Sequence, residues 1–340
     1  MKYIKTCAIV IPCRNEEKYI AKCLESIINN DYPKDKLEVF VCDGMSNDQT
    51  QSIVDEFTKK YSFIKLLLNK NKTTPHALNL GITNTLADVI IILGAHAEIY
   101  PDYVSQSIDK MSISQDMGCV GGILYNTPEN KKSAIVSKAM SSGFGVGNAH
   151  FRTGNKEGYV DTVAFGAYKK EVFESIGLFD INLARNQDDE FNYRLLKNGF
   201  KIYLSKDIKA KYYVRSSFKN LFKQYFQYGY WKVYVNKKHA AITTVRQLVP
   251  LFFVLMLISG GIGSVLSLFI LKAFISILSF YFILSFISAF KQSKNIVEIS
   301  LIMYTFLLLH TSYGLGYLQG IIHFFILRKN SNENYISLSR

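Results

Sequence analysis

The C-terminal third of the chain holds three long segments that contain no Asp, Glu, Lys or Arg, at residues 248–271, 273–290 and 299–327. About 20 consecutive apolar residues let a helix cross the hydrocarbon core of a bilayer. Lys272, the single charge between the first two segments, predicts a very tight turn there. We therefore predict a membrane-embedded region over residues 247–328 with two or three crossings, followed by a polar tail at 329–340.

A strongly basic stretch precedes the first apolar segment. Residues 194–238 contain 12 Lys or Arg and only one acidic residue, Asp207. Lys and Arg next to a membrane span are retained on the cytoplasmic side. This rule predicts a multi-pass protein of the plasma (inner) membrane whose N-terminal part is cytoplasmic. The Cys residues are odd in number and all lie within the first 119 residues without a CxxC pair, which also favours a reducing compartment.

Two kinds of partner fit a basic stretch, namely nucleic acid and a membrane surface. The formal net charge of +13 and the interleaved aromatic residues are typical of a nucleic-acid-binding protein. Within the stretch, however, apolar residues recur at helical spacing, at Phe218, Leu221, Phe222, Tyr225 and Phe226. An amphipathic helix on anionic lipid headgroups explains the period, the charge and the position together. We predict such membrane-interface helices over residues 216–246, and no nucleic-acid partner.

The first 215 residues alternate between short apolar runs and helical patterns. Strands are expected at residues 8–11, 37–42, 63–68, 87–93 and 118–124, and helices at 16–28, 48–59, 75–84 and 101–111. This order predicts an α/β domain over residues 1–215 with a mostly parallel sheet that helices cover on both faces. Ligands bind beyond the carboxyl ends of such strands, which points to residues 12–16, 43–48 and 94–98.

The edge of this sheet lacks the phosphate-binding loops of two large nucleotide-binding classes. No GxGxxG follows the first strand and no GxxxxGK[ST] is present, so a dehydrogenase and a P-loop NTPase are excluded. Asp43 instead stands where the second strand ends. Its carboxylate can accept hydrogen bonds from a base N–H or a ribose hydroxyl, although an ordinary Asp-Gly turn explains the residue equally well.

Six motifs occur in a fixed order along the chain. They are Ile11-Pro12-Cys13-Arg14-Asn15-Glu16, the Asp43-Gly44-x-Ser46-x-Asp48-x-Thr50 run, Ala77-Leu78-Asn79-Leu80-Gly81-Ile82, Gly94-Ala95-His96-Ala97-Glu98, Gln187-Asp188-Asp189-Glu190-Phe191 and Gln227-Tyr228-Gly229-Tyr230-Trp231. In kind and spacing they resemble glycosyltransferase family 2, an inverting family with the GT-A (Rossmann-like) fold. The resemblance is greatest to membrane-bound bacterial transferases of exopolysaccharide and capsule assembly, such as the succinoglycan-type glucosyltransferases.

This resemblance implies a function and a set of partners. A sugar would be transferred, with inversion, from a nucleotide sugar, specifically a UDP-sugar, to a polyprenyl-linked or growing saccharide in bacterial surface polysaccharide synthesis. Membrane lipids and polysaccharide assembly proteins are the further partners that it implies. Gly94 and Tyr230 depart from the family pattern. An alternative interpretation is therefore a catalytically weak or inactive relative that acts as a membrane assembly subunit.

The resemblance also assigns residues to the donor. The residues implied are Pro12, Asn15, Glu16, Asp43, Asn79 and Ala95. The first three would shape the nucleoside pocket, and Asp43 would recognise the uracil or the ribose. Asn79 would lie beside the donor sugar or its diphosphate.

Three further residues have a structural interpretation beside the functional one. Ser46 and Asp48 are expected to hold the loop and cap the next helix rather than contact a ligand. Gly166 matches a family position where a small residue leaves room for the acceptor. An ordinary tight turn explains this glycine equally well.

The catalytic base is expected among the acidic residues at 187–190. The family uses the Asp of a Glu-Asp pair that is followed two residues later by an acid, and this register selects Asp188. A carboxylate there would take the proton of the attacking acceptor hydroxyl. Asp189 is the second candidate, and it is also explained as a residue that positions the base or caps the following helix.

Gln227 and Trp231 match the two ends of the Gln-x-x-Arg-Trp element of the family. The resemblance implies that they line the acceptor channel and the diphosphate. Tyr230 occupies the position of the family arginine, so one phosphate contact is missing. Trp231 is alternatively explained as an anchor at the depth of the lipid headgroups, which Trp favours.

The largest departure from the family lies at its metal-binding Asp-x-Asp motif. This chain has Gly94-Ala95-His96 there, so the first carboxylate is absent and the second is replaced by an imidazole. His96 and Glu98 share one face of an extended chain and are the predicted ligands for Mn²⁺ or Mg²⁺. The requirement for a divalent cation is left open, because a Lys or Arg of the basic stretch can neutralise part of the same charge.

Overall fold

The computed structural model describes residues 5–214 and 217–329. Within these residues the chain forms two compact units. The first contains residues up to 125 together with 150–213, and the second contains residues 126–149 together with those from 214 onward. The chain therefore enters the second unit twice.

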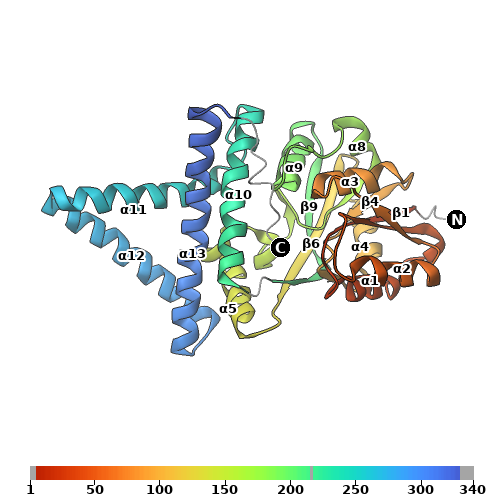
Figure 1. The fold of residues 1–340 in the computed structure, drawn as a ribbon, viewed down its shortest axis with the longest axis horizontal. Helices are drawn as coiled ribbons and strands as arrows, with labels where there is room; N and C mark the ends of the chain where they lie inside the picture. Colours follow the sequence, from red (N-terminus) through yellow and green to blue (C-terminus); the bar gives the residue numbers. More distant parts are fainter. Residues whose placement is uncertain (1–4, 215–216, 330–340) are drawn as a thin grey trace. The chain divides into compact units, whose positions relative to one another are not determined.

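A mixed β-sheet forms the centre of the first unit (Figure 1). Within the described residues it has nine strands in the order β3-β2-β1-β4-β8-β6-β9-β5, with β7 paired to β9. The strands are β1 (Cys7–Cys13), β2 (Leu37–Asp43), β3 (Ile64–Leu68), β4 (Val89–Ile92), β5 (Ala97–Ile99), β6 (Met117–Thr127), β7 (Gly158–Tyr159), β8 (Ala167–Lys169) and β9 (Lys201–Tyr213). The predicted α/β fold class is confirmed.

The parallel part of the sheet consists of the four strands β3, β2, β1 and β4. Beyond them β8 pairs antiparallel with β4 and β6, and β9 pairs antiparallel with β5 and β7. The sequence analysis does not predict β9, because the lysines of this strand lie within the basic stretch and mask its alternating apolar residues. In the structure Ile202, Leu204 and Ile208 of this strand are buried, while Lys201 and Lys206 are exposed.

Helices of the first unit connect the strands. They are α1 (Ile20–Ile28), α2 (Thr50–Lys60), α3 (Thr74–Thr83), α4 (Tyr103–Lys110), α7 (His150–Thr153), α8 (Lys170–Ile176) and α9 (Gln187–Lys197), with a 3₁₀ turn at Lys34–Lys36. Helix α1 begins four residues later than predicted. The residues before it form a turn in which the backbone N–H groups of Tyr19 and Ile20 donate to the carbonyl oxygen of Glu16.

The carboxyl ends of the parallel strands lie at one edge of the sheet. The register places Cys13 of β1 opposite Asp43 of β2, and Ile92 of β4 opposite Val10 of β1. The loops after these three strands carry residues 14–19, 44–49 and 93–96. The predicted ligand-binding residues of these loops are thus next to one another, as expected for a parallel arrangement.

Helices form the second unit. They are α5 (Lys131–Met140), α6 (Gly143–Val146), α10 (Phe218–His239), α11 (Val249–Leu266), α12 (Leu268–Gln292) and α13 (Ile296–Ile321), with a 3₁₀ turn at Val245–Leu248 and a π-helical turn at Ile322–Ile326. Three helices in the described part of the chain are long and apolar enough to cross a membrane, at Val245–Leu266, Leu268–Gln292 and Ile296–Ile326.

Helices α11 and α12 form a V-shaped hairpin, and α11 runs across α13 rather than alongside it (Figure 1). The tip of the V is Ser267, whose backbone is extended with φ −151° and ψ 128°. The predicted turn at Lys272 is therefore wrong, because Lys272 lies inside α12. The break occurs at the serine instead, where the extended backbone interrupts the helical hydrogen bonding.

Helix α10 packs along α13 through glycines. A Cβ at Gly229 would lie 2.0 Å from the carbonyl oxygen of Tyr313, and one at Gly316 would lie 2.0 Å from that of Phe226. The two helices therefore approach at backbone distance. Segment 126–149 joins the same unit, since Lys138 of α5 pairs with Glu298 of α13.

Candidate active site

The loops after β1 and β2 are tied together by hydrogen bonds around Asp43. The Asp43 carboxylate is fully buried and accepts hydrogen bonds from Ser46 N (2.8 Å), Ser46 Oγ (2.5 Å) and Gln51 Nε2 (2.7 Å). Ser46 Oγ in turn accepts a hydrogen bond from Asn15 N at 2.8 Å. A carboxylate has about four acceptor positions, and three of them serve the loop. Asp43 therefore ties this loop to the edge of the sheet, and its predicted contact with the uracil or the ribose stays a prediction.

Asn15 and Glu16 close the same edge from the side of β1. Asn15 adopts a φ of 53°, and its Oδ1 accepts a hydrogen bond from Asn47 N at 3.0 Å. Glu16 is buried, its backbone N donates to Thr50 Oγ1 at 2.8 Å, and its Oε1 lies 3.3 Å from His96 Nδ1. The structure thus brings Asn15, Glu16 and His96 to the edge that carries Asp43. Pro12 is half-buried at the end of β1.

Asp48 fastens the start of α2. Its Oδ1 accepts hydrogen bonds from Thr50 N (3.0 Å) and Thr50 Oγ1 (2.6 Å), and its Oδ2 accepts one from Glu17 N (3.3 Å). Partial burial acts to raise the pKa of Asp48, but these hydrogen bonds to the charged form outweigh it and hold the pKa below its ordinary value. The prediction that Ser46 and Asp48 hold this loop is confirmed.

The segment after β4 carries Gly94, Ala95 and His96. A Cβ at Gly94 would lie 2.9 Å from Cε1 of Phe165, and Ala95 is buried. The His96 imidazole lies beside the Glu16 carboxylate and has the ring of Tyr212 with its centroid 5.1 Å away. Position 94 is therefore covered by an aromatic ring.

Glu98 lies on β5 and is engaged by β9. The register places Glu98 opposite Lys211, whose Nζ lies 3.2 Å from Glu98 Oε2, and the hydroxyl of Tyr213 donates to Oε1. Partial burial acts to raise the pKa of Glu98, but the hydrogen bonds from Tyr213 and Lys211 outweigh it and lower the pKa. Glu98 is therefore a carboxylate that its own neighbours satisfy.

The residues predicted to hold a divalent cation do not form a ligand set that fits one. Glu98 faces Lys211 and Tyr213, and position 94 offers no carboxylate. Mg²⁺ and Mn²⁺ favour several oxygen ligands. Across residues 5–214 and 217–329, no group of three His, Cys, Asp or Glu side chains is placed to hold a metal ion.

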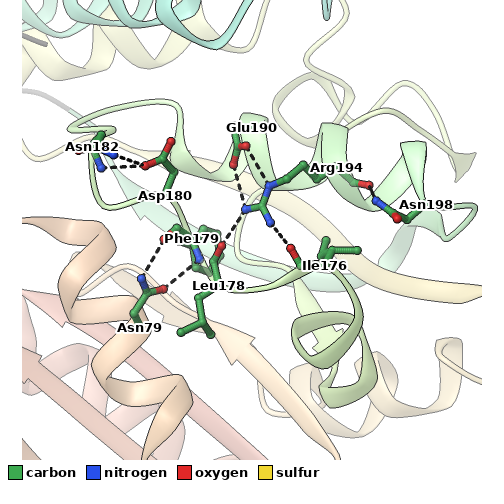
Figure 2. A network of polar contacts seen from close by, with 9 residues as sticks. All are labelled: Asn79, Ile176, Leu178, Phe179, Asp180, Asn182, Glu190, Arg194 and Asn198. Atoms are coloured by element: carbon green, nitrogen blue, oxygen red, sulfur yellow. Dashed lines mark hydrogen bonds and ion pairs between the residues drawn. The ribbon is translucent and has the colours of Figure 1, made fainter. Parts of the chain in front are cut away.

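Asn79 of α3 forms a pair of hydrogen bonds with the backbone of Phe179 (Figure 2). Its Nδ2 donates to Phe179 O at 2.8 Å, and its Oδ1 accepts from Phe179 N at 3.0 Å. Both ends of the amide thus bind the loop that leads from α8 to α9. This geometry favours a role for Asn79 in holding the loop, and its predicted contact with the donor stays a prediction.

Arg194 of α9 holds the same loop from the other side (Figure 2). Its guanidinium donates to both carboxylate oxygens of Glu190, at 2.9 and 3.0 Å, and to the carbonyl oxygens of Ile176 (2.5 Å) and Leu178 (2.8 Å). Glu190 is fully buried, so loss of the arginine would remove a positive charge from beside a buried carboxylate. These bonds fix the start of α9 to the loop before it.

Asp188 and Asp189 lie in the first turn of α9. Asp188 is exposed and Asp189 is half-buried, and Asp189 N donates to Asp188 Oδ1 at 2.9 Å. The positive end of the helix dipole stabilises carboxylates in this turn. Asp188 is thus accessible at the start of α9, and its predicted role as the general base stays a prediction.

Comparison with known proteins assigns the chain to a family. Residues 8–177 match the sequence profile of Glycosyl transferase family 2. The dolichyl N-acetyl-alpha-D-glucosaminyl phosphate 3-beta-D-2,3-diacetamido-2,3-dideoxy-beta-D-glucuronosyltransferase of Methanococcus voltae is 38% identical over 260 residues, which are 74% of this chain and 80% of that protein. The chain belongs to glycosyltransferase family 2.

Other members of the family and of its fold are also similar to this glycosyltransferase. The succinoglycan biosynthesis protein ExoA of Rhizobium meliloti (strain 1021) is 27% identical over 245 residues, which are 72% of this chain and 74% of ExoA. The mannosyltransferase PcManGT from Pyrobaculum calidifontis, solved in complex with GDP-Man and Mn²⁺, has a TM-score of 0.60 at 16% identity over 94% of this chain and 88% of that chain. This last similarity shows a shared GT-A fold.

Gln227 and Trp231 of the glycosyltransferase lie on α10 in the second unit. Both side chains are buried, and the Trp231 ring contacts those of Tyr234 and Phe324. Tyr230, at the position of the family arginine, is also buried, and its hydroxyl forms a hydrogen bond with Nδ1 of His323. These three residues of α10 are thus covered by α13 and the π-helical turn. The predicted contacts of Gln227 and Trp231 with acceptor and diphosphate stay predictions.

Gly166 of the glycosyltransferase is required by packing inside the first unit. A Cβ there would lie 2.7 Å from Cys119 Sγ and 2.9 Å from the ring of Tyr168. Its carbonyl oxygen accepts a hydrogen bond from Ile92 N at 3.0 Å. Close packing in the core therefore accounts for this glycine without an acceptor.

The sequence analysis does not predict the contacts of three residues around His96, namely Arg152, Phe165 and Tyr212. The guanidinium carbon of Arg152 lies 4.8 Å from the centroid of the Tyr212 ring, and that ring is 6.2 Å from the ring of Phe165. Tyr212 reaches His96 because β9 pairs antiparallel with β5, which begins at Ala97. No local sequence pattern connects these positions, because the contact depends on long-range strand pairing.

Proposed function

We propose that this glycosyltransferase moves a sugar from a UDP-sugar to a lipid-linked saccharide, with inversion at the anomeric carbon. The observation that carries this proposal is the 38% identity over 260 residues to a relative whose name gives a dolichyl-linked sugar phosphate as acceptor. The relation to a succinoglycan biosynthesis protein supports a product that belongs to a surface polysaccharide or a glycolipid.

Asp188 acts as the general base in this proposal. Its carboxylate takes the proton of the acceptor hydroxyl while the oxygen attacks the anomeric carbon from the side opposite the leaving group. The bond from the anomeric carbon to the diphosphate breaks, and its electron pair leaves with UDP. Asp188 is the exposed member of the pair, while Asp189 is half-buried one residue further into the helix. Asp189 therefore positions the base.

The donor lies at the carboxyl ends of β1, β2 and β4 in this proposal. Pro12, Asn15 and Glu16 shape the nucleoside pocket, and Asp43 recognises the uracil or the ribose. No step is assigned to a divalent cation, because the residues after β4 do not fit one.

The hairpin of α11 and α12 crosses the membrane twice in this proposal, and α10 and α13 lie at its cytoplasmic surface. The 18 residues of α11 extend about 27 Å, close to the about 30 Å of a hydrocarbon core. Two crossings leave the basic residues of α10, the lysines Lys291 and Lys294 and the end of α13 on one side. The positive-inside rule makes that side cytoplasmic.

Transfer of labelled sugar into lipid tests this function. Membranes that contain the protein are incubated with a panel of radiolabelled nucleotide sugars and a lipid extract, and the label in the lipid fraction identifies the donor. Asp188→Asn should lower turnover by about 10² or more with nucleotide binding retained, because only the proton acceptor is lost. An active Asp188→Asn beside an inactive Asp189→Asn would instead assign the base to Asp189.

A further inference from the structure

Position 94 is closed to a metal-binding side chain by Phe165. A Cβ at Gly94 would lie 2.9 and 3.0 Å from Cε1 and Cζ of the Phe165 ring. Phe165 has a φ of 53°, and its carbonyl oxygen accepts a hydrogen bond from the hydroxyl of the buried Tyr103 at 2.5 Å. The ring is therefore held over Gly94 by its backbone. The first ligand position of the Asp-x-Asp motif is filled with an aromatic surface.

The aromatic rings beside Gly94 lead to the guanidinium group of Arg152. The Phe165 ring lies 6.2 Å from the ring of Tyr212, which contacts His96 on one side and carries the Arg152 guanidinium at 4.8 Å from its centroid. Arginine stacks on aromatic rings through the face of its planar guanidinium group. Arg152 is thus a positive charge separated by one ring from the end of β4.

Lys211 is another cation close to this segment. Lys211 lies opposite Glu98 in the strand register and forms an ion pair with it at 3.2 Å. A lysine is also a point charge, whereas the guanidinium of arginine binds two phosphate oxygens in one plane. Of these two cations, Arg152 is the one suited to a diphosphate.

We propose that Arg152, stacked on Tyr212, binds the donor diphosphate and supplies the positive charge for which the residues after β4 form no metal site. This inference rests on the proposed function, because it takes a nucleoside diphosphate as the leaving group. It identifies a diphosphate-binding residue outside the six sequence motifs. It also gives Phe165 and Tyr212 a role, since together they fill the metal position and hold the arginine.

Calorimetric titration of the full-length protein in detergent tests the proposal with two probes, uridine and UDP, each with EDTA and with Mn²⁺. We expect the wild type to bind UDP with the same affinity in EDTA and in Mn²⁺. Arg152→Gln should weaken UDP binding by about tenfold or more and leave uridine binding unchanged, because charge-assisted hydrogen bonds to the diphosphate are lost. Arg152→Lys should give an intermediate affinity.

Lys156→Gln is the matched control, because it removes an exposed positive charge four residues away and should leave UDP binding unchanged. The role of Arg152 would be overturned if Arg152→Gln bound UDP as tightly as the wild type does, or if the wild type bound UDP only with Mn²⁺. Binding of uridine in the same experiments would still uphold the proposed donor. Absence of binding by both uridine and UDP would overturn the proposed donor, and the inference with it.

Discussion

The backbone of Gly94 lies against the ring of Phe165 at a separation that leaves no room for a side chain. The ring cannot move away easily, because Tyr103 fixes the Phe165 carbonyl and the neighbouring Tyr212 ring stands beside it. An aspartate introduced at position 94 therefore meets the ring before it can act as a ligand. We therefore predict that Phe165 prevents a carboxylate at position 94 from acting as a metal ligand.

Gly94→Asp alone should lower the thermal unfolding midpoint and give no response of UDP binding to Mn²⁺. The reason is overpacking against Phe165, which costs about 1–3 kcal/mol. Gly94→Asp combined with Phe165→Ala should recover part of the midpoint and make UDP binding respond to Mn²⁺. Unfolding in detergent and titration of UDP with and without Mn²⁺ measure both effects. A single Gly94→Asp variant that responds to Mn²⁺ at an unchanged midpoint would contradict the role of the ring.

The sequence predicts well which residues lie at or just after the ends of the parallel strands. Asp43 and Glu16 lie at one edge because parallel strands end together, and the pattern of strands is visible in the sequence. Asn79 shows the limit of this reasoning. Its motif is local, but its partner is the backbone of Phe179, 100 residues away. Hydrogen bonds of this kind depend on tertiary packing and leave no periodic signal.

At the scale of elements, the packing of α10 on α13 depends on small residues. Gly229, Gly316 and Gly320 stand where the helices approach, and each would place a Cβ within 3.0 Å of the backbone of the other helix. The apolar stripe that predicts an amphipathic helix is only part of this contact. Polar residues of α10, including Gln224 and Asn236, are buried as well, and Asn236 Nδ2 donates to the Tyr317 hydroxyl at 2.8 Å.

Gly229→Ala should lower the thermal unfolding midpoint of the second unit. Its Cβ would lie 2.0 Å from Tyr313 O, so α10 and α13 must separate, and overpacking of this kind costs about 1–3 kcal/mol. Gly261→Ala in α11 is the matched control, because no atom lies within 4 Å of its added Cβ. Thermal unfolding in detergent compares the two variants. Equal midpoints for Gly229→Ala and Gly261→Ala would show that the helices do not pack at backbone distance.

Elements with strong periodicity are predicted from the sequence, and elements defined by partners are not. The apolar runs of β1 and β2 and the long helices of the C-terminal third agree with the predicted segments to within a few residues. Helix α5 is not predicted, because its sequence is mixed and its place is set by the ion pair of Lys138 with Glu298 and by burial of Val136 and Ala139.

At the scale of the molecule, most of the surface of α11 and α12 is apolar and uncovered. Phe252, Ile262, Phe269 and Phe280 are more than half exposed. Exposed apolar surface of this extent requires a lipid or protein environment. Helix α13 differs, because α10 covers one side of it and a larger share of its side chains is buried. This difference supports the proposed topology, in which the hairpin lies in the bilayer and the helix pair lies at its surface.

The native cysteines allow this topology to be measured by thiol labelling. All five are buried, and burial raises the pKa of Cys42 to about 12 and the pKa values of the others further above their ordinary value. Since the thiolate is the reactive form, the folded wild type should react little with a membrane-impermeant maleimide at pH 7. Single cysteines placed in the helical unit will then report their own side of the membrane.

Labelling of single cysteines at three positions distinguishes two membrane crossings from three. Ser267→Cys, at the tip of the hairpin, should be labelled in intact cells, because two crossings place the tip outside. Ser293→Cys, between α12 and α13, and Leu327→Cys, after the π-helical turn, should be labelled only after the membrane is permeabilised. Labelling of Leu327→Cys in intact cells would show that α13 crosses as a third span. Protection of Ser267→Cys until permeabilisation would show that the hairpin does not cross at all.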